Sequence, residues 1–126
     1  MEKHLHIVFA QPPDGISDEE FNRWYDAHVP EILSVPSFRS CRRYALDPVV
    51  TDDTAPRGFR YLAVYEVEGD PAAAVAELER VGLGSKDSYA DLKEVDAGSL
   101  ELPAWWGDVR FASWNCVSLG DRVDSL

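Results

Sequence analysis

The chain of 126 residues is poor in cysteine and in positive charge, and it has no long apolar run. Its 12 lysines and arginines face 23 aspartates and glutamates, which gives a formal net charge of −11 at pH 7. Such a surface repels phosphate groups, which argues against nucleic acids and anionic membranes as partners. No stretch approaches the roughly 20 apolar residues of a membrane-spanning helix. The N-terminal segment also lacks the apolar block of a signal peptide, so we expect a cytoplasmic protein.

The sequence also lacks the motifs of several common chemistries. Neither Cys41 nor Cys116 has a C-x-x-C partner or an adjacent histidine, so metal binding and thiol catalysis are not favoured. A disulfide between them is disfavoured in a reducing compartment. There is no glycine-rich phosphate loop, no G-x-S-x-G nucleophile motif and no H-E-x-x-H zinc motif. We therefore expect neither a bound metal nor a cofactor.

The spacing of apolar and turn-forming residues predicts four strands and two helices. Strands are expected at residues 3–10, 38–46, 59–67 and 109–119, and helices at residues 17–33 and 72–81. A short further helix is expected around residues 87–93. The order β-α-β-β-α-β is that of the ferredoxin-like α+β class, a four-stranded antiparallel sheet with two helices on one face. At this length the chain forms one domain, residues 1–126.

The two main helices have recognisable starts, and the first contains a proline. Ser17 followed by Glu20 forms a capping box, and Asp70 followed by Pro71 is an N-cap with proline at the first helical position. Pro30 cannot donate a hydrogen bond and crowds the preceding turn. The first helix is therefore expected to kink or to end near Pro30.

His28 is the most informative residue, because it lies in the apolar stripe of the first helix. On a helical wheel it falls within the arc of Phe21, Tyr25 and Ile32, with Trp24 at the flank. A buried imidazole needs partners for its nitrogens, and it is also the side chain best suited to proton transfer near neutral pH. Two interpretations follow: a core histidine satisfied by a hydrogen bond, or a general acid or base.

The first strand separates two histidines from an apolar face. His4 and His6 share one side of the strand. The other side is expected to face the core and carries Leu5, Ile7 and Phe9. Two histidines in this spacing could bind a metal only with a third ligand, for which His28 is the candidate. Because the helices cover one face of the sheet, apolar residues on the other face need a cover, which a second copy of the chain would supply.

Aromatic residues are numerous enough to line a flat apolar pocket. They include Trp24, Tyr25, Tyr61, Tyr65, Trp105, Trp106 and Trp114. The hydroxyl groups of Tyr61 and Tyr65 could orient a ligand. Adjacent arginines on a strand point to opposite faces, so only one of Arg42 and Arg43 can serve a pocket, and we take Arg42 as the candidate for binding a carboxylate or phenolate.

One segment resembles a known family. The pattern Phe21-x-x-Trp24-x-x-x-His28-x-Pro30, followed by Val35-Pro36-x-Phe38 and Arg42-Arg43-Tyr44, resembles the first helix and second strand of the EthD-like family of dimeric α/β barrels. The resemblance covers about residues 16–46. It implies a ferredoxin-like subunit, a homodimer and a small hydrophobic or aromatic ligand. The start Lys3-His4-Leu5 is similar to that of plant polyketide cyclases of the same superfamily, which implies that the histidine face points toward the ligand cavity.

The residues and the resemblance together predict an enzyme that needs no cofactor. It would act on a small aromatic or polyketide-like metabolite by acid–base chemistry: dehydration, isomerisation, cyclisation or phenol oxygenation. The expected catalytic residues are His28, Tyr65 and His6. The expected substrate-binding residues are Trp24, His4, Tyr61, Arg42, Trp105 and Trp106. Two alternatives stay open: a ligand-binding accessory protein of an oxidative degradation pathway, and a heme-binding protein with a histidine as axial ligand.

Overall fold

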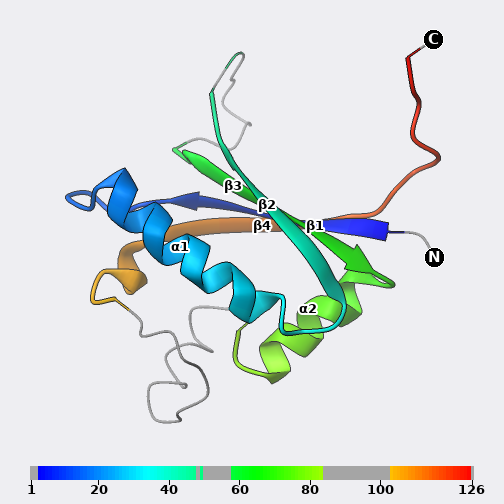
Figure 1. Cartoon of the computed structure of the whole chain (residues 1–126), viewed down its shortest axis with the longest axis horizontal. Helices are drawn as coiled ribbons and strands as arrows, with labels where there is room; N and C mark the ends of the chain where they lie inside the picture. The colour runs from blue at the N-terminus through cyan, green and yellow to red at the C-terminus, as the bar shows by residue number, and fades with distance from the viewer. Residues whose placement is uncertain (1–2, 48, 50–57, 84–102, 126) are drawn as a thin grey trace.

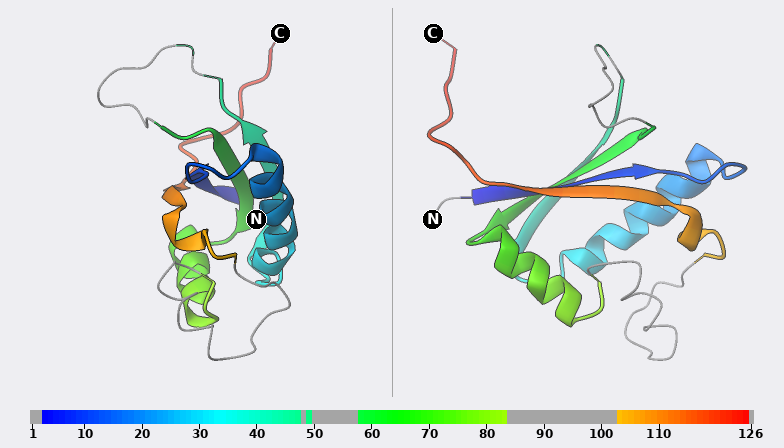
Figure 2. Two further views of the ribbon diagram at one scale, coloured as in Figure 1. Left: turned by 90° about the vertical axis from the view of Figure 1, so that its left-hand side faces the viewer. Right: turned by 180° about the vertical axis from the view of Figure 1, so that it is seen from behind.

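A computed structural model describes residues 3–47, 49, 58–83 and 103–125. The elements are β1 (Lys3–Gln11), α1 (Asp18–Ile32), β2 (Phe38–Ala45), β3 (Tyr61–Glu68), α2 (Pro71–Arg80), the 3-10 turn η1 (Trp106–Asp108) and β4 (Arg110–Cys116). The strands form one antiparallel sheet in the order β2-β3-β1-β4, with both helices on the same side of it (Figure 1 and Figure 2). The predicted ferredoxin-like fold is confirmed. The short helix predicted at residues 87–93 lies outside the described residues.

The predicted helix starts are confirmed by hydrogen bonds. The hydroxyl of Ser17 accepts the backbone N–H of Glu20 at 3.1 Å, and the carboxylate of Asp70 accepts that of Ala72 at 3.1 Å. The helix α1 does not end at Pro30 but continues to Ile32. The proline lies in the last turn, where it removes only one helical donor. Among the described residues, neither helix has the length and apolarity that a membrane crossing needs.

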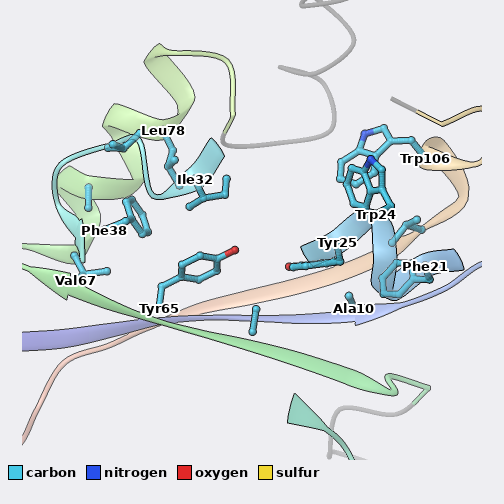
Figure 3. Packing of buried hydrophobic residues seen from close by; sticks show 14 residues of the cluster. Ala10, Phe21, Trp24, Tyr25, Ile32, Phe38, Tyr65, Val67, Leu78 and Trp106 are labelled. Atoms are coloured by element: carbon cyan, nitrogen blue, oxygen red, sulfur yellow. The ribbon is translucent and has the colours of Figure 1, made fainter. Parts of the chain in front are cut away.

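The main core lies between the helices and one face of the sheet, the inner face. Sheet residues that point to this side include Ala10, Ala63, Tyr65 and Val67, and all four are buried. The helix α1 packs over them through its aromatic stripe, and α2 packs beside it through Leu78 (Figure 3). The strand pairing places His4 and His6 on this inner face, because they stand opposite Val67 and Tyr65.

The other face of the sheet, the open face, is not covered by the helices. The residues Leu5, Ile7 and Phe9 lie here and are only partly buried, so the prediction that they face the core of the subunit is wrong. Both faces of β1 are apolar, and the pattern along one strand does not reveal which face the helices cover. The open face also carries Trp114, which is 50% exposed, and Tyr44, which is 44% exposed.

The two cysteines are free, as expected. Cys41 lies on β2 and Cys116 on β4, which are the two edge strands of the sheet. The pairing of Cys41 with Tyr65 puts it on the inner face, whereas the pairing of Cys116 with Leu5 puts it on the open face. The fold therefore keeps the two thiols at opposite edges and on opposite faces.

Candidate functional site

His28 is buried in an aromatic cluster on the inner side of α1. The residue is only 6% exposed. Its ring lies parallel to that of Trp24, one helical turn earlier, and the two ring centroids are 5.0 Å apart. The ring of Tyr25 meets it edge-on at 5.7 Å, and the ring of Trp106 lies at 6.1 Å. Burial lowers the pKa of His28 to about 4. The imidazole is therefore uncharged at neutral pH.

The short turn η1 brings both adjacent tryptophans onto α1. Trp106 is buried with its ring 4.6 Å from that of Trp24 (Figure 3). Trp105 meets Trp24 edge-on at 5.8 Å. Of the residues predicted to bind a ligand, these three tryptophans therefore form one cluster with His28. The rings of these residues form one continuous apolar wall beside α1, on the inner side of the sheet.

Two tyrosine hydroxyl groups meet in the middle of the inner face. The side chains of Tyr25 from α1 and Tyr65 from β3 point toward one another and share a hydrogen bond (Figure 3). Burial raises the pKa of Tyr25 far above its usual value, although the nearby guanidinium of Arg43 opposes that shift. Tyr65 also forms a hydrogen bond with Cys41, whose pKa is raised mainly by burial. Both hydroxyl groups are thus held at one point, and that of Tyr25 stays protonated at neutral pH.

His6 lies beside this pair at the next strand. Its Nδ1 is 2.8 Å from Oδ1 of Asn115 on β4, and its ring centroid is 6.3 Å from that of Tyr65. Burial lowers the pKa of His6, whereas the hydrogen bond with Asn115 favours its charged form. Unlike His28, the residue remains partly exposed.

These contacts belong to one row of polar residues that crosses the whole sheet. Cys41, Tyr65, His6 and Asn115 stand opposite one another on β2, β3, β1 and β4 respectively. The predicted residues Tyr65 and His6 are the two middle members of this polar row. The outer members were not predicted, because a single sequence does not give the register that aligns them. Tyr25 was also missed as a site residue. Its position on the same helical stripe as His28 could have identified it.

The arginine that reaches the inner face is Arg43, not Arg42. Arg42 stands opposite Val64 on the open face and is exposed, so the structure does not bring it together with the predicted site residues of the inner face. Arg43 stacks its guanidinium 4.3 Å from the ring centroid of Tyr25 and donates hydrogen bonds to Asp26 and Asn22. The sequence showed that adjacent arginines diverge, but the choice between them depended on which face the helices cover.

The remaining predicted residues lie at the two ends of the inner face. Tyr61 stacks on Phe21 with ring centroids 5.7 Å apart, toward the start of α1. At the other end, Nδ1 of His4 accepts the backbone N–H of Ser118 at 3.1 Å. Among the described residues, no group of three or more histidine, cysteine or acidic side chains is placed to hold a metal ion. The three histidines His4, His6 and His28, named above as the candidate ligand set, do not form such a group in the described part of the chain.

An open cavity of about 510 Å³ lies at a different place, where β1 ends and β4 begins. It is lined by Gln11, Pro12, Pro13, Asp14, Asp108 and Arg110. This lining is largely polar and contains none of the predicted site residues. The cavity therefore does not match the expected binding of a hydrophobic aromatic ligand.

Comparisons with known proteins agree with this fold. No protein-family model and no curated protein sequence matches the chain. Among solved structures, the hydroxynitrile lyase of Passiflora edulis is 15% identical, with 96% of this chain and 98% of that chain aligned at a TM-score of 0.53. The protein At3g17210 of Arabidopsis thaliana is 15% identical, with 93% and 98% aligned at a TM-score of 0.52.

A third structure, an ethyl tert-butyl ether D (EthD) family protein of Bacillus halodurans, is 14% identical over 95% of this chain and 99% of that chain, at a TM-score of 0.44. Identities this low describe the fold and not the activity. At the level of the fold, the chain is thus a ferredoxin-like α+β protein, which is the fold implied by its resemblance to the EthD-like family.

Proposed function

We propose that this protein is a cofactor-independent enzyme that performs acid–base chemistry on a small aromatic or polyketide-like metabolite, within the EthD-like group of dimeric α/β barrels. One observation carries the proposal: the hydroxyl pair of Tyr25 and Tyr65 lies next to a partly exposed histidine, His6, in a site walled by aromatic rings. A proton acceptor beside fixed hydroxyl donors is the arrangement that proton abstraction next to a carbonyl or phenol requires.

His6 is the side chain best placed to accept a proton from the substrate. Burial lowers the pKa of His6 below its usual value, whereas the hydrogen bond with Asn115 favours the charged form, so the ring is largely uncharged at neutral pH and can act as a proton acceptor. The hydroxyl of Tyr65 donates a hydrogen bond to the oxygen on which negative charge develops. The hydroxyl of Tyr25 holds that of Tyr65 in place, because the raised pKa of Tyr25 keeps its hydroxyl protonated and able to donate a hydrogen bond.

His28 has a different role in this proposal from the one that the helical pattern favoured. An imidazole with a pKa of about 4 is a weak base, because burial disfavours its charged form. Its ring instead extends the wall made by Trp24 and Trp106, which would pack against the flat face of an aromatic ligand.

The hydroxynitrile lyase of similar fold suggests the first probe of activity. An aromatic hydroxynitrile loses its hydroxyl proton to a base, its C–C bond to the nitrile breaks, the electron pair leaves with cyanide and an aldehyde forms. The panel continues with an enol lactone, which reports isomerisation, and an electron-rich phenol, which reports oxygenation. Turnover of at least one probe is expected.

Two single-atom changes test the roles. Tyr65→Phe removes only the hydroxyl and should lower kcat about 100- to 1,000-fold, as for the loss of one donor to a developing oxyanion. Tyr44→Phe is the control, because Tyr44 is exposed on the open face of the sheet, away from the hydroxyl pair, and kcat should stay near the wild-type value. Equal turnover in wild type and Tyr65→Phe would contradict the proposal.

A binding protein without activity is the other outcome of the same experiment. The aromatic wall around Trp24 is the observation that favours it, because such a surface can hold an apolar ligand without any chemistry. In that case, probes would raise the unfolding temperature of the protein with no product formed. The accessory-protein interpretation would then replace the enzyme.

We also propose that the protein is a homodimer joined through the open faces of two sheets. Trp114 and Tyr44 are exposed there, and Ile7, Val64 and Phe9 lie between them as partly buried apolar residues. A monomer seldom leaves so continuous an apolar surface in water. A second copy would cover it with an identical surface related by a twofold axis.

A further inference from the structure

We infer that Asn115 is a positioning residue for His6: it accepts the hydrogen on Nδ1 and so leaves Nε2 as the nitrogen that takes a proton. The catalytic part of this inference rests on the proposed function, whereas the choice of tautomer does not. Asn115 does not belong to any sequence motif recognised above. It enters the site only because β4 pairs with β1.

The geometry of the two strands supports the contact. His6 and Asn115 stand directly opposite one another in the antiparallel pair of β1 and β4, where side chains on one face are close neighbours. The separation between Nδ1 of His6 and Oδ1 of Asn115 is 2.8 Å, the length of a good hydrogen bond. An amide oxygen can only accept, so Nδ1 must carry the hydrogen.

The rest of the imidazole has apolar neighbours that do not fix its proton. The ring of Phe38 meets that of His6 edge-on at 5.9 Å, and the ring of Tyr65 lies tilted at 6.3 Å. These contacts restrict the tilt of the imidazole, while the hydrogen bond with Asn115 selects its tautomer. The second nitrogen of a functional histidine is commonly held in this way, so that the first nitrogen has a defined role.

His4 provides a comparison within the same strand. It shares the inner face with His6, but its Nδ1 accepts the backbone N–H of Ser118 at 3.1 Å. An accepting Nδ1 places the hydrogen on Nε2. Two histidines separated by one residue are therefore held in opposite tautomers by two different contacts with β4 and the residues after it.

The tautomers can be measured directly. In ¹⁵N-labelled protein at pH 8, long-range proton–nitrogen spectra should show hydrogen on Nδ1 of His6 and on Nε2 of His4. The chain has three histidines, so His4→Gln and His6→Gln variants suffice to assign the signals. In Asn115→Leu, the hydrogen of His6 should move to Nε2, whereas Asn115→Asp retains an acceptor and should keep it on Nδ1.

Activity then tests the catalytic part. In Asn115→Leu, kcat for a turned-over probe should fall about 10- to 100-fold with KM nearly unchanged, as for other residues that orient a functional imidazole. Asn115→Asp should retain most of the wild-type kcat, because the carboxylate is still an acceptor. Ser113→Ala is the matched control, because Ser113 lies two residues earlier on β4, opposite Val8 and exposed, and neither the tautomer nor kcat should change.

Three results separate this inference from the proposed function. If His6 keeps its hydrogen on Nδ1 in folded Asn115→Leu, Asn115 does not position it and the inference is wrong. If the tautomer changes but kcat does not, the catalytic part is wrong. If no probe is turned over by the wild type, the proposed function fails, while the change of tautomer alone still supports Asn115 as the residue that orients His6.

Discussion

A histidine held inside a layer of aromatic rings makes folding sensitive to acid. His28 loses its proton on entering this layer of Trp24, Tyr25 and Trp106, because burial disfavours the charged form of the imidazole. The burial that makes His28 a weak base therefore also makes the free energy of unfolding depend on pH.

Replacing His28 with leucine should remove part of the pH dependence of stability. In the wild type, the folded-state pKa of about 4 lies below the unfolded value of 6.5, so the unfolded chain binds more protons between these values. Stability is fully present above pH 6.5 and is lost as the pH falls toward 4, by about 3 kcal/mol in total and roughly 1.4 kcal/mol by pH 5.5. Urea unfolding at pH 7.5 and pH 5.5 measures this loss.

The comparison isolates His28 because His4, His6 and all carboxylates are shared by both proteins. The His28→Leu variant should lose less stability than the wild type over this pH interval. An identical loss in the two proteins would mean that His28 is not buried in its uncharged form.

At the scale of single residues, the sequence predicted local partners better than distant ones. The stripe of α1 was readable because Phe21, Tyr25, His28 and Ile32 repeat with the period of one helix. Asn115 was not readable, since its partner His6 lies 109 positions away and only the strand register joins them. Sites made of long-range pairs are therefore the part of this protein that required a structure.

One arginine from an edge strand adds polar contacts between the sheet and α1 to their shared apolar core. Arg43 leaves β2 toward the helix, donates hydrogen bonds to Asp26 and Asn22, and stacks on Tyr25. Its side chain is only 15% exposed, which separates it from an ordinary surface ion pair. This contact fixes α1 over the polar row, and therefore sets where the hydroxyl of Tyr25 meets Tyr65.

Replacing Arg43 with methionine should destabilise the protein by about 1–3 kcal/mol, because it removes two hydrogen bonds, one of them partly buried, and a cation–π contact. Arg42→Met is a matched control on the open face, with an expected change within about 0.5 kcal/mol. Urea unfolding monitored by tryptophan fluorescence measures both. Equal effects of the two substitutions would contradict the difference between the faces.

At the scale of elements, the sequence predicted the bounds of the helices and strands closely, but not which face of a strand the helices cover. The predicted helix at residues 17–33 became Asp18–Ile32, because its cap, its proline and its periodicity are local signals. The faces of β1 were misjudged, since Leu5, Ile7 and Phe9 are as apolar as any core strand. Local patterns describe an element, but the side of the sheet that the helices cover is decided by the whole fold.

At the scale of the whole molecule, the open face is an apolar surface that the helices leave uncovered, and the proposed second copy would cover it. Trp114 lies on the edge strand β4, where it meets Phe9 edge-on at 5.6 Å and stands opposite Ile7. A charged group at this place would have to be buried between two sheets, which is costly.

Replacing Trp114 with glutamate should convert the proposed dimer into a monomer while the subunit stays folded. Sedimentation velocity measures the mass, and far-ultraviolet circular dichroism reports the fold. Val81→Glu is the control, because Val81 is 37% exposed just after α2, away from the open face, and this variant should stay dimeric. A wild-type protein that sediments as a monomer would overturn the proposed dimer.

The polar row has a consequence for how the protein folds. It draws one residue from each of four strands, and its last contact joins β1 to β4 across 109 positions of chain. Closing so long a loop is among the slow events of folding, because the entropy is lost before the pairing stabilises it. The contact between His6 and Asn115 therefore cannot exist before β4 has paired with β1. As long as β4 is unpaired, Asn115 cannot select the tautomer of His6, so the orientation of the imidazole proposed above arises only when these two strands have joined.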